Sequence, residues 1–349
     1  CRCFNALRSS NISTRATDTD LRLTALRHWI QAIDGLEGAD PQPASGDASF
    51  RRYFRVHSDK ASYIAMDAPP GQEDCKPFIQ VAGYLESMQL QAPRVLEANL
   101  DDGFLLLTDL GNTQYLELLQ EKRDAANTLY APTLRALLIM QSRGEAFQSS
   151  LPPYDEKLLR FELSLFHDWL CEEHLGIEFD EQREASWQAL CNLLVSNALD
   201  QPQVFVHRDY HSRNLMVIED APGILDFQDA VEGPITYDLV SLLKDCYIKW
   251  DREQVATWMN TFCVESRNIG LHSLSDDQFT RCFDLMGVQR HLKAAGIFAR
   301  LNHRDGKPDY LRDVPRTLSY IVDLASKYDE LAFVIELINT HCLPALEPS

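Results

Sequence analysis

The stretch VFVHRDYHSRNLMVIEDAPGILD, at positions 204–226, decides the fold of this chain of 349 residues. His207, Asp209 and Asn214 form the pattern H-x-D-x-x-x-x-N, and the stretch ends at Asp226 after a short apolar run. The apolar residues before His207 and after Asn214 are each typical of a short strand, and EDAPG is typical of a turn. We therefore expect Asp209 and Asp226 to follow the ends of adjacent short strands and to face one site.

These side chains suit the transfer of a phosphoryl group from ATP to a hydroxyl, a reaction that needs positioning and charge neutralisation more than covalent help. Asp209 is the candidate catalytic residue, because a carboxylate can hold the acceptor hydroxyl in line and take its proton. Asn214 and Asp226 are the candidate metal ligands, because Mg²⁺ prefers hard oxygen donors. His207 is expected to support the loop through hydrogen bonds.

After Asp226 the chain resembles the aminoglycoside phosphotransferase family, a small-molecule branch of the protein-kinase-like fold. It reads DFQD at 226–229 where protein kinases carry D-F-G, continues with G-P-x-x-Y-D-L at 233–239, and has no A-P-E segment. The resemblance implies an α+β bilobal fold, with a small β-rich ATP-binding lobe over 17–108 and a larger helical lobe over 109–349. It also implies ATP and Mg²⁺ as cofactors, and an active site in the cleft between the lobes.

Three further motifs narrow this resemblance. GDASFRRYFRV at 46–56, MDAPP at 66–70 and LLLTDLG at 105–111 are similar to the anomeric sugar kinases of bacterial cell-wall recycling, which phosphorylate N-acetylmuramic acid and N-acetylglucosamine at C1. The resemblance implies an amino-sugar substrate, a sugar 1-phosphate product, a role in peptidoglycan recycling and a downstream sugar-1-phosphate nucleotidyltransferase. Two alternatives stay open: a kinase of another small-molecule hydroxyl such as an aminoglycoside, and a nucleotide-binding pseudokinase.

The candidate ATP-binding residues lie in the first third of the chain. Met66 stands where kinases end their third strand in a phosphate-binding lysine. Nearby arginines are the alternative cations, and strand alternation puts Arg51 and Arg55 on one face and Arg52 on the other. The candidates are Gly46, Asp47, Ala48 and Ser49 as a phosphate-covering loop, Arg51 and Arg52 after it, and Thr108, Asp109 and Leu110 as an adenine-binding hinge.

The candidate acceptor-binding residues lie in and around the 204–226 stretch. Glu162, on a predicted helix over 158–173, is the preferred ligand for a sugar hydroxyl. His211 and Arg213 lie inside the loop itself, and Arg213 can neutralise transferred phosphate or hold a lactyl carboxylate. Asp229, three residues after Asp226, is expected to assist the metal or the sugar.

Composition excludes several other classes of protein. The net charge of −19 argues against nucleic acid or anionic lipid as the main partner. No apolar run approaches the length of a membrane span, and the nine cysteines lack paired C-x-x-C spacing. Reduced thiols in a cytoplasmic protein are therefore expected. Residues 1–16 contain no acidic side chain, and we expect them to form a disordered extension, native or not, rather than a targeting peptide.

Apolar periodicity predicts the remaining elements. A hairpin is expected over 50–56 and 62–66, and a buried strand over 104–107. Asp238 is expected to cap a helix over 239–250 and to be structural. The first predicted helix is capped by Asp18 or Asp20 and ends at Gly35. The other predicted helices run over 76–89, 116–138, 158–173, 285–301 and 318–343.

Overall fold

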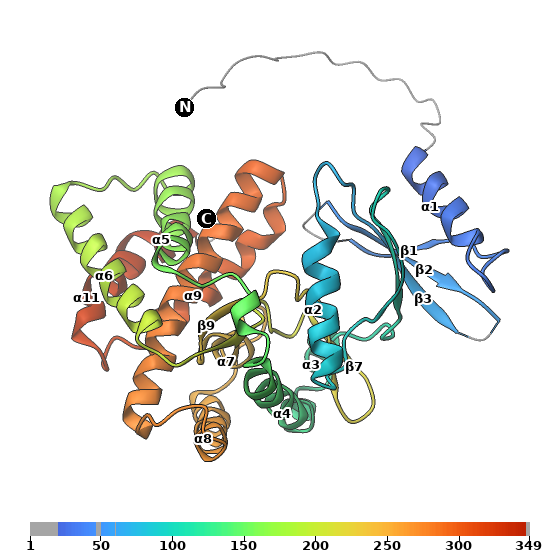
Figure 1. The fold of residues 1–349 in the computed structure, drawn as a ribbon. Coiled ribbons are helices and arrows are strands. Elements are labelled where there is room, and N and C mark those ends of the chain that lie inside the picture. The colour runs from blue at the N-terminus through green and yellow to red at the C-terminus, as the bar shows by residue number, and fades with distance from the viewer. Residues whose placement is uncertain (1–19, 47–49, 60, 347–349) are drawn as a thin grey trace, which may run out of the picture. The chain divides into compact units, whose positions relative to one another are not determined.

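The computed structural model describes residues 20–46, 50–59 and 61–346, with the side chains of Ser45 and Gly46 left aside. The chain divides into two compact units (Figure 1). Unit 1 contains the residues up to Glu73 together with Leu96–Asp109, and unit 2 contains Asp74–Val95 and everything from Leu110 onward. The expected extension at 1–16 lies outside the described residues, and the predicted lobe boundaries stay a prediction.

Unit 1 is built on a five-stranded sheet with the strand order β1-β2-β3-β5-β4. The strands are β1 (Gln42–Gly46), β2 (Arg52–His57), β3 (Ser62–Asp67), β4 (Val95–Asn99) and β5 (Phe104–Thr108). β2 and β3 form the predicted hairpin, and β5 is the predicted buried strand. Met66 pairs with Tyr53 on one side and Leu105 on the other, and is 1% exposed. A charged side chain at that position would have to enter the apolar core.

Helix α1 (Leu21–Gln31) closes the core of unit 1. The Asp20 carboxylate caps it by accepting the N–H of Leu23, because the first N–H groups of a helix have no partner inside it. Leu26 and Ile30, one turn apart on the helix, are fully buried against apolar side chains of β2, β3 and β5. The sheet and this helix thus bury a single apolar cluster.

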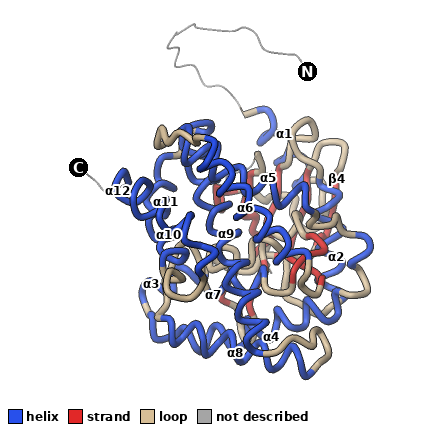
Figure 2. Tube along the Cα trace, turned by 90° about the vertical axis from the view of Figure 1, so that its left-hand side faces the viewer, coloured by secondary structure: helices blue, strands red, loops and turns tan. Residues whose placement is uncertain are grey.

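Unit 2 combines two small sheets with many helices (Figures 1 and 2). β6 (Gln203–Val206) pairs antiparallel with β9 (Val231–Pro234), and β7 (Leu215–Val217) pairs antiparallel with β8 (Pro222–Ile224). The helices are α2 (Cys75–Ser87), α3 (Tyr115–Glu121), α4 (Ala126–Gly144), α5 (Glu156–Leu165), α6 (Glu181–Leu199), α7 (Tyr237–Leu243), α8 (Arg252–Asn268), α9 (Asp276–Asp305), α10 (Val314–Val322), α11 (Ala332–Leu337) and α12 (Leu343–Leu346).

Helix α9 forms the centre of unit 2. It contacts α5, α6, α7, α8 and α10, and in Figures 1 and 2 it runs among them. A capping box at Ser275 and Gln278 starts it, and Gly306, with φ of 65°, ends it in the left-handed conformation. Because other elements cover its middle on several sides, even the polar residues there, from Asp284 to Lys293, are buried. The expected helix over 285–301 is therefore the middle of a longer one.

Three predicted helices are shorter or broken. The one over 116–138 is interrupted at Lys122, between α3 and α4. The one over 318–343 divides into α10, α11 and a π-helical turn (Ile338–Cys342) that leads into α12. The one over 239–250 ends at Leu243, because the following residues turn to bind the loop described below. Apolar periodicity continues across such breaks and does not reveal them.

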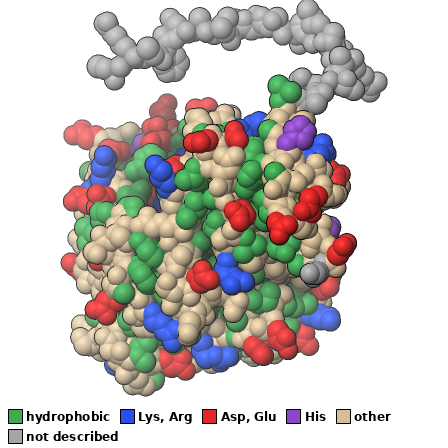
Figure 3. All heavy atoms as spheres, turned by 45° about the vertical axis from the view of Figure 1, so that its right-hand side comes forward, with side chains coloured by type: hydrophobic (Ala, Val, Ile, Leu, Met, Phe, Trp, Pro, Cys, Tyr) green, Lys and Arg blue, Asp and Glu red, His purple; other side chains and the backbone are tan. Residues whose placement is uncertain are grey.

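The acidic composition of the sequence is visible on the molecular surface. Asp and Glu side chains are dispersed over the face shown in Figure 3, among basic and apolar ones. Within the part of the chain that the structure describes, no helix is both long and apolar enough to cross a membrane.

Candidate functional site

Two aspartates hold the loop that carries His207 to Asn214. Asp238, on α7, accepts the backbone N–H of His207 at 2.7 Å and that of Arg208 at 3.0 Å. Asp245 accepts both the N–H and the hydroxyl of Ser212, at 3.0 and 2.5 Å. Arg208 has φ of 78°, a strained conformation for a non-glycine residue, and such strain persists only where the surroundings enforce it. The loop is therefore fixed at both ends by buried carboxylates.

The expectation that Asp238 caps its helix is wrong. Thr236 occupies the N-cap position, and Asp238 lies in the first turn with both oxygens directed at the loop. Burial raises the pKa of Asp238 to about 7, against the opposing effect of the two N–H groups. Its role is to position the loop, a role that required the tertiary fold to bring positions 207 and 238 together.

Asp209 is half-buried and surrounded by basic groups. Its backbone N–H donates to Nδ1 of His207 at 3.2 Å, which fixes the histidine as a loop support. Burial by itself would raise the pKa of Asp209, but the charges of Lys293, His211 and Arg208 outweigh it and lower the pKa. Asp209 is therefore an ionised carboxylate at neutral pH, the form that can accept a proton.

Asn214 joins the two acidic residues of the motif. Its Nδ2 donates to the backbone carbonyl of Asp209 at 3.1 Å and to Oδ2 of Asp226 at 3.3 Å. The expectation that Asp209 and Asp226 follow adjacent strands is wrong, because β6 and β8 belong to different two-stranded sheets. The loop and the amide of Asn214 bring the carboxylates together instead. Asp226 has φ of 63°, so it too is held in the left-handed region.

The Asn214–Asp226 pair fits a hard divalent cation. Both side-chain hydrogen bonds of Asn214 use Nδ2, so within the described residues its Oδ1 has no hydrogen bond. Gln228 donates to Oδ1 of Asp226 at 2.8 Å and to the carboxylate of Asp229 at 3.3 Å. The donor set is thus an amide oxygen and carboxylates, with no sulfur or imidazole, which is the set that Mg²⁺ prefers.

Glu162, the predicted sugar ligand, lies in a buried network. It is 2% exposed, and its Oε1 lies 2.5 Å from Nη2 of Arg208 and 3.0 Å from Nζ of Lys293. Its Oε2 accepts the hydroxyl of Tyr154 and, at 3.1 Å, the amide of Gln289. Both oxygens therefore already have partners, so this glutamate holds Arg208 and Lys293 in place. Its role as a sugar ligand stays a prediction.

The other predicted acceptor residues lie at different depths. His211 is half-buried, its N–H donates to the carbonyl of Asp209 at 3.0 Å, and burial lowers its pKa. The guanidinium carbon of Arg213 lies 4.2 Å from the ring centre of Tyr247 and 5.7 Å from that of Tyr310. Asp229 is exposed.

The predicted ATP-side arginines all have carboxylate partners within unit 1. Arg51 donates twice to Glu73, at 3.1 Å each. Arg52 bonds to the buried Asp67 at 2.9 and 2.5 Å and also to Asp20. Arg55 bonds to Asp109 at 2.6 and 3.1 Å. These pairs hold the cations on the sheet, and their roles toward ATP stay predictions.

Only some of the other residues predicted to bind ATP lie in the part of the chain that the structure describes. Asp47, Ala48 and Ser49 lie outside the described residues, and Gly46 ends β1. Thr108 ends β5, and the division between the two units falls between Asp109 and Leu110, inside the predicted hinge.

Sequence reasoning missed three residues of α9. Gln289, Arg290 and Lys293 all reach the network around the loop, and Lys293 also donates to the hydroxyl of Tyr237 at 2.8 Å. They lie about eighty positions after Asp209, on a helix for which only the range 285–301 was predicted. The available signal was the polar group QRHLK between the apolar runs LMGV and AAGIFA. A buried helix carries such residues only when they have partners.

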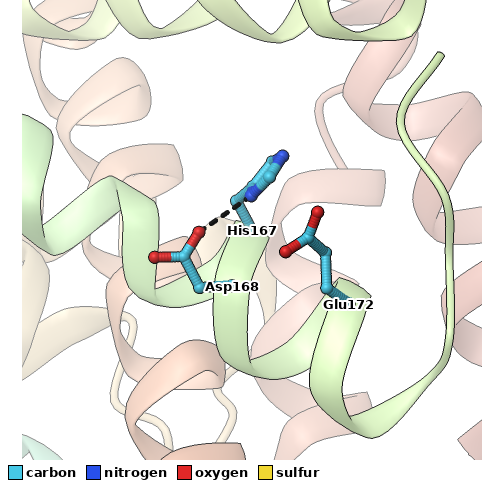
Figure 4. A group of neighbouring side chains, drawn as sticks. All are labelled: His167, Asp168 and Glu172. Carbon is cyan, nitrogen blue, oxygen red and sulfur yellow. Dashed lines mark hydrogen bonds and ion pairs between the residues drawn. The ribbon is translucent and has the colours of Figure 1, made fainter.

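A second cluster of titratable groups lies on the π-helix (Phe166–His174) that continues α5 (Figure 4). Nδ1 of His167 lies 2.9 Å from Asp168, and Glu172 is the third member. The wider π-helical turn aligns positions five apart, which brings His167 and Glu172 to one side. Glu184 approaches Nε2 of the same histidine at 3.3 Å. Both carboxylates of the cluster are exposed and can be solvated, so we assign no metal to it.

Solved structures with the same fold include kinases of small molecules. A Plasmodium vivax ethanolamine kinase aligns with a TM-score of 0.62 at 12% identity, covering 92% of this chain and 90% of the other. An ADP-bound aminoglycoside phosphotransferase aligns with a TM-score of 0.56 at 13% identity, covering 86% and 97%. The fold of this chain is therefore the protein-kinase-like fold, as predicted, and the site defines a phosphotransferase.

Sequence comparison gives the family. Residues 40–274 match the model of the phosphotransferase enzyme family, and the chain belongs to this family. A protein of Pseudomonas aeruginosa named N-acetylmuramate/N-acetylglucosamine kinase is 49% identical over 85% of this chain and 87% of its own length. Proteins of the same name from Pseudomonas putida and Neisseria meningitidis are 46% and 40% identical, each over 91% of this chain and 96% of their own length. The family and fold imply ATP as phosphoryl donor.

Proposed function

We propose that this protein is an ATP-dependent kinase that phosphorylates the anomeric C1 hydroxyl of N-acetylmuramic acid and N-acetylglucosamine, giving the sugar 1-phosphate and ADP. The observation that carries the proposal is the Asp209–Asn214–Asp226 constellation in a chain whose relatives at 40–49% identity have the name of such a kinase. The relatives support the substrate, and the constellation supports the reaction.

Asp209 orients the acceptor and takes its proton. Its ionised carboxylate accepts a hydrogen bond from the C1 hydroxyl, which holds the attacking oxygen in line with the phosphoryl group. The surrounding charges of Lys293, Arg208 and Arg290 keep this carboxylate ionised. As the oxygen–phosphorus bond forms, the hydroxyl proton passes to Asp209, and the bond from the γ-phosphorus to the bridging oxygen of ADP breaks.

Asn214 and Asp226 would hold Mg²⁺ through Oδ1 of the amide and the carboxylate. A cation held there would supply positive charge to neutralise the charge that develops on the phosphates. Hydrogen bonds from Asn214 and Gln228 keep the Asp226 carboxylate oriented. On the nucleotide side we propose the backbone of residues 46–49, Arg51, Arg52 and the segment 108–110.

The chemistry of the product indicates which class of enzyme uses it next. A sugar 1-phosphate is the substrate that a nucleotidyltransferase joins to a nucleotide, so an enzyme of that class is the proposed downstream partner. Because ATP is the donor, we propose that the protein works in the cytoplasm, as part of peptidoglycan recycling.

The decisive experiment measures ADP release in a coupled assay with N-acetylmuramate, N-acetylglucosamine, glucose and kanamycin as acceptors. Turnover with the two amino sugars alone is expected. Turnover with kanamycin alone would make the protein an aminoglycoside kinase, and ATP binding without turnover on any acceptor would make it a pseudokinase.

The role of Asp209 has its own test. Asp209→Asn is expected to lower kcat by about 10²–10⁴-fold, the range for a positioned acid–base group, while ATP binding stays nearly intact. Isothermal titration calorimetry with a non-hydrolysable ATP analogue measures whether ATP binding is retained. Unchanged turnover in this variant would contradict the assigned role.

A further inference from the structure

Three basic side chains gather on one side of the catalytic loop, around the segment that follows α7. The ring of Tyr247 lies 5.5 Å from that of His211 and 4.2 Å from the guanidinium carbon of Arg213. Next to it, Cys246 lies with its Sγ 3.5 Å from Nη1 of Arg290. His211, Arg213 and Arg290 are named here the basic cluster. They come from the loop and from α9, which are far apart in sequence.

The basic cluster lies directly beside the proposed site of chemistry. The N–H of His211 donates to the carbonyl of Asp209 at 3.0 Å, and Arg213 immediately precedes the proposed metal ligand Asn214. The charge of Arg290 acts on both Asp209 and His211. His211 and Arg290 therefore belong to the electrostatic surroundings of an acceptor held by Asp209, and Arg213 lies next to them.

Arg213 and Arg290 differ from the other cations near the loop in forming no ion pair within the described residues, although the charges of Asp209 and Asp245 act on Arg290 and that of Asp313 acts on Arg213. Arg208 and Lys293 share the carboxylate of Glu162. By contrast, among the described residues no carboxylate lies within 4.0 Å of the nitrogens of Arg213 or Arg290. The nearby Asp245 already accepts from Ser212 and from the N–H of Tyr247 at 2.8 Å.

The unused hydrogen-bonding capacity lies on buried atoms. Arg290 is 5% exposed, and its Nε has no hydrogen bond within the described residues. Nδ1 of His211 is likewise buried and has no hydrogen bond within the described residues. A buried donor without a partner costs about 1–3 kcal/mol, and more when it is charged. The folded chain therefore keeps costly groups that an anionic ligand would satisfy.

The two proposed substrates differ in the group that such a cluster recognises. N-acetylmuramic acid is N-acetylglucosamine with a lactyl ether at C3, and this ether ends in a carboxylate. A chain of net charge −19 offers such an anion little general attraction, so its binding needs a local cation. A guanidinium group offers the paired N–H donors that match a carboxylate.

We propose that Arg213 and Arg290, together with His211, bind the lactyl carboxylate of N-acetylmuramic acid and so set the preference between the two sugars. This inference rests on the proposed function. The stacking of Arg213 on Tyr247 restricts its side chain before the substrate arrives, which lowers the entropy lost on binding.

The test compares kcat/KM for the two sugars in Arg213→Gln and Arg290→Gln. Each variant is expected to lower kcat/KM for N-acetylmuramate at least tenfold more than for N-acetylglucosamine, through KM. Arg213→Lys is expected to recover part of the difference, because the charge returns without the planar fork. Arg300→Gln is the control on α9, since Arg300 is half-buried and, like Arg290, has an Nε with no hydrogen bond within the described residues. It is expected to leave the ratio unchanged.

The outcomes separate the inference from the proposed function. Equal losses for both sugars, carried by kcat, would assign the cluster to the transferred phosphate and overturn the inference while the kinase assignment stands. Inactivity of the wild type on both sugars would overturn the proposed function and the inference with it. If Arg290→Gln fails to fold, as judged by circular dichroism, the ratio in Arg213→Gln decides.

Discussion

At the residue scale, the catalytic loop depends on groups that burial forces into one protonation state. His207 is fully buried, accepts the N–H of Asp209 through Nδ1, and burial lowers its pKa to about 4. A protonated imidazole would lose this acceptor and add a charge to a low-dielectric site. The histidine of the H-x-D pattern thus works as a neutral support.

Because His207 is neutral in the folded protein, the free energy of unfolding should fall in acid. In the unfolded chain a histidine has a pKa near 6.5, so between pH 6.5 and 4 the unfolded state binds a proton that the folded state does not. Stability is then complete above pH 6.5 and is lost as the pH falls through 4. The free energy of unfolding of the wild type should fall by about 3 kcal/mol over this range relative to His207→Asn. Urea titrations of both proteins at pH 7 and pH 4 measure the difference. A difference that does not change with pH would contradict the buried neutral histidine.

At the element scale, α9 makes the site possible because it packs very close to its neighbours. The backbone of Leu165 and Phe166 lies so near Gly296 that an added Cβ would come within 2.2–2.4 Å of it. Such a contact requires a backbone shift, since no side chain rotation relieves it. The close packing carries Gln289, Arg290 and Lys293 to the same region as Glu162, on α5.

A pair of glycine variants tests this packing. Gly296→Ala is expected to lower the free energy of unfolding by about 3 kcal/mol or more, because overpacking a buried contact displaces backbone. Gly287→Ala on the same helix is the control. There an added Cβ meets at closest the flexible end of Lys244, at 3.4 Å, so stability should change by no more than about 1 kcal/mol. Urea unfolding followed by circular dichroism compares them, and equal effects would contradict the assigned contact.

At the scale of the whole molecule, the chain has one unit that carries the paired arginines of the sheet and another that carries the catalytic loop. The net charge of −19 gives anionic ligands no general attraction, and acidic side chains are dispersed over the face that Figure 3 shows, so local basic groups must favour such ligands. A ligand that binds only the native state stabilises it by an amount that grows with the logarithm of the ligand concentration above Kd.

Nucleotide and metal should therefore stabilise the fold together. An ATP analogue with Mg²⁺ at about 100 times its dissociation constant should add about 2.7 kcal/mol to the free energy of unfolding. Chelation with EDTA should remove most of this gain and abolish turnover. Asp226→Asn should lose the magnesium-dependent part, while it melts near the wild-type temperature without ligand. Thermal unfolding with and without Mg²⁺ measures both, and a full magnesium effect in Asp226→Asn would contradict its assignment as a ligand.

The sequence by itself determined the reaction class and the fold. The spacing of Asp209, Asn214 and Asp226 is local, and a motif confined to one loop can be read without knowing what packs around it. The motifs near residues 50, 66 and 105 likewise pointed to a family that the comparisons confirm. The apolar periodicity of the hairpin and of α9 was sufficient for their existence, though not for their ends.

Only the tertiary structure decided what surrounds the loop. Asp238 and Asp245 became loop anchors, Glu162 became the partner of Arg208, and Arg290 joined the basic cluster. Each of these contacts joins positions tens of residues apart, and their charges matter because burial removes water from around them. No local pattern encodes such a distance, so hydrogen-bond geometry and burial had to be seen in three dimensions.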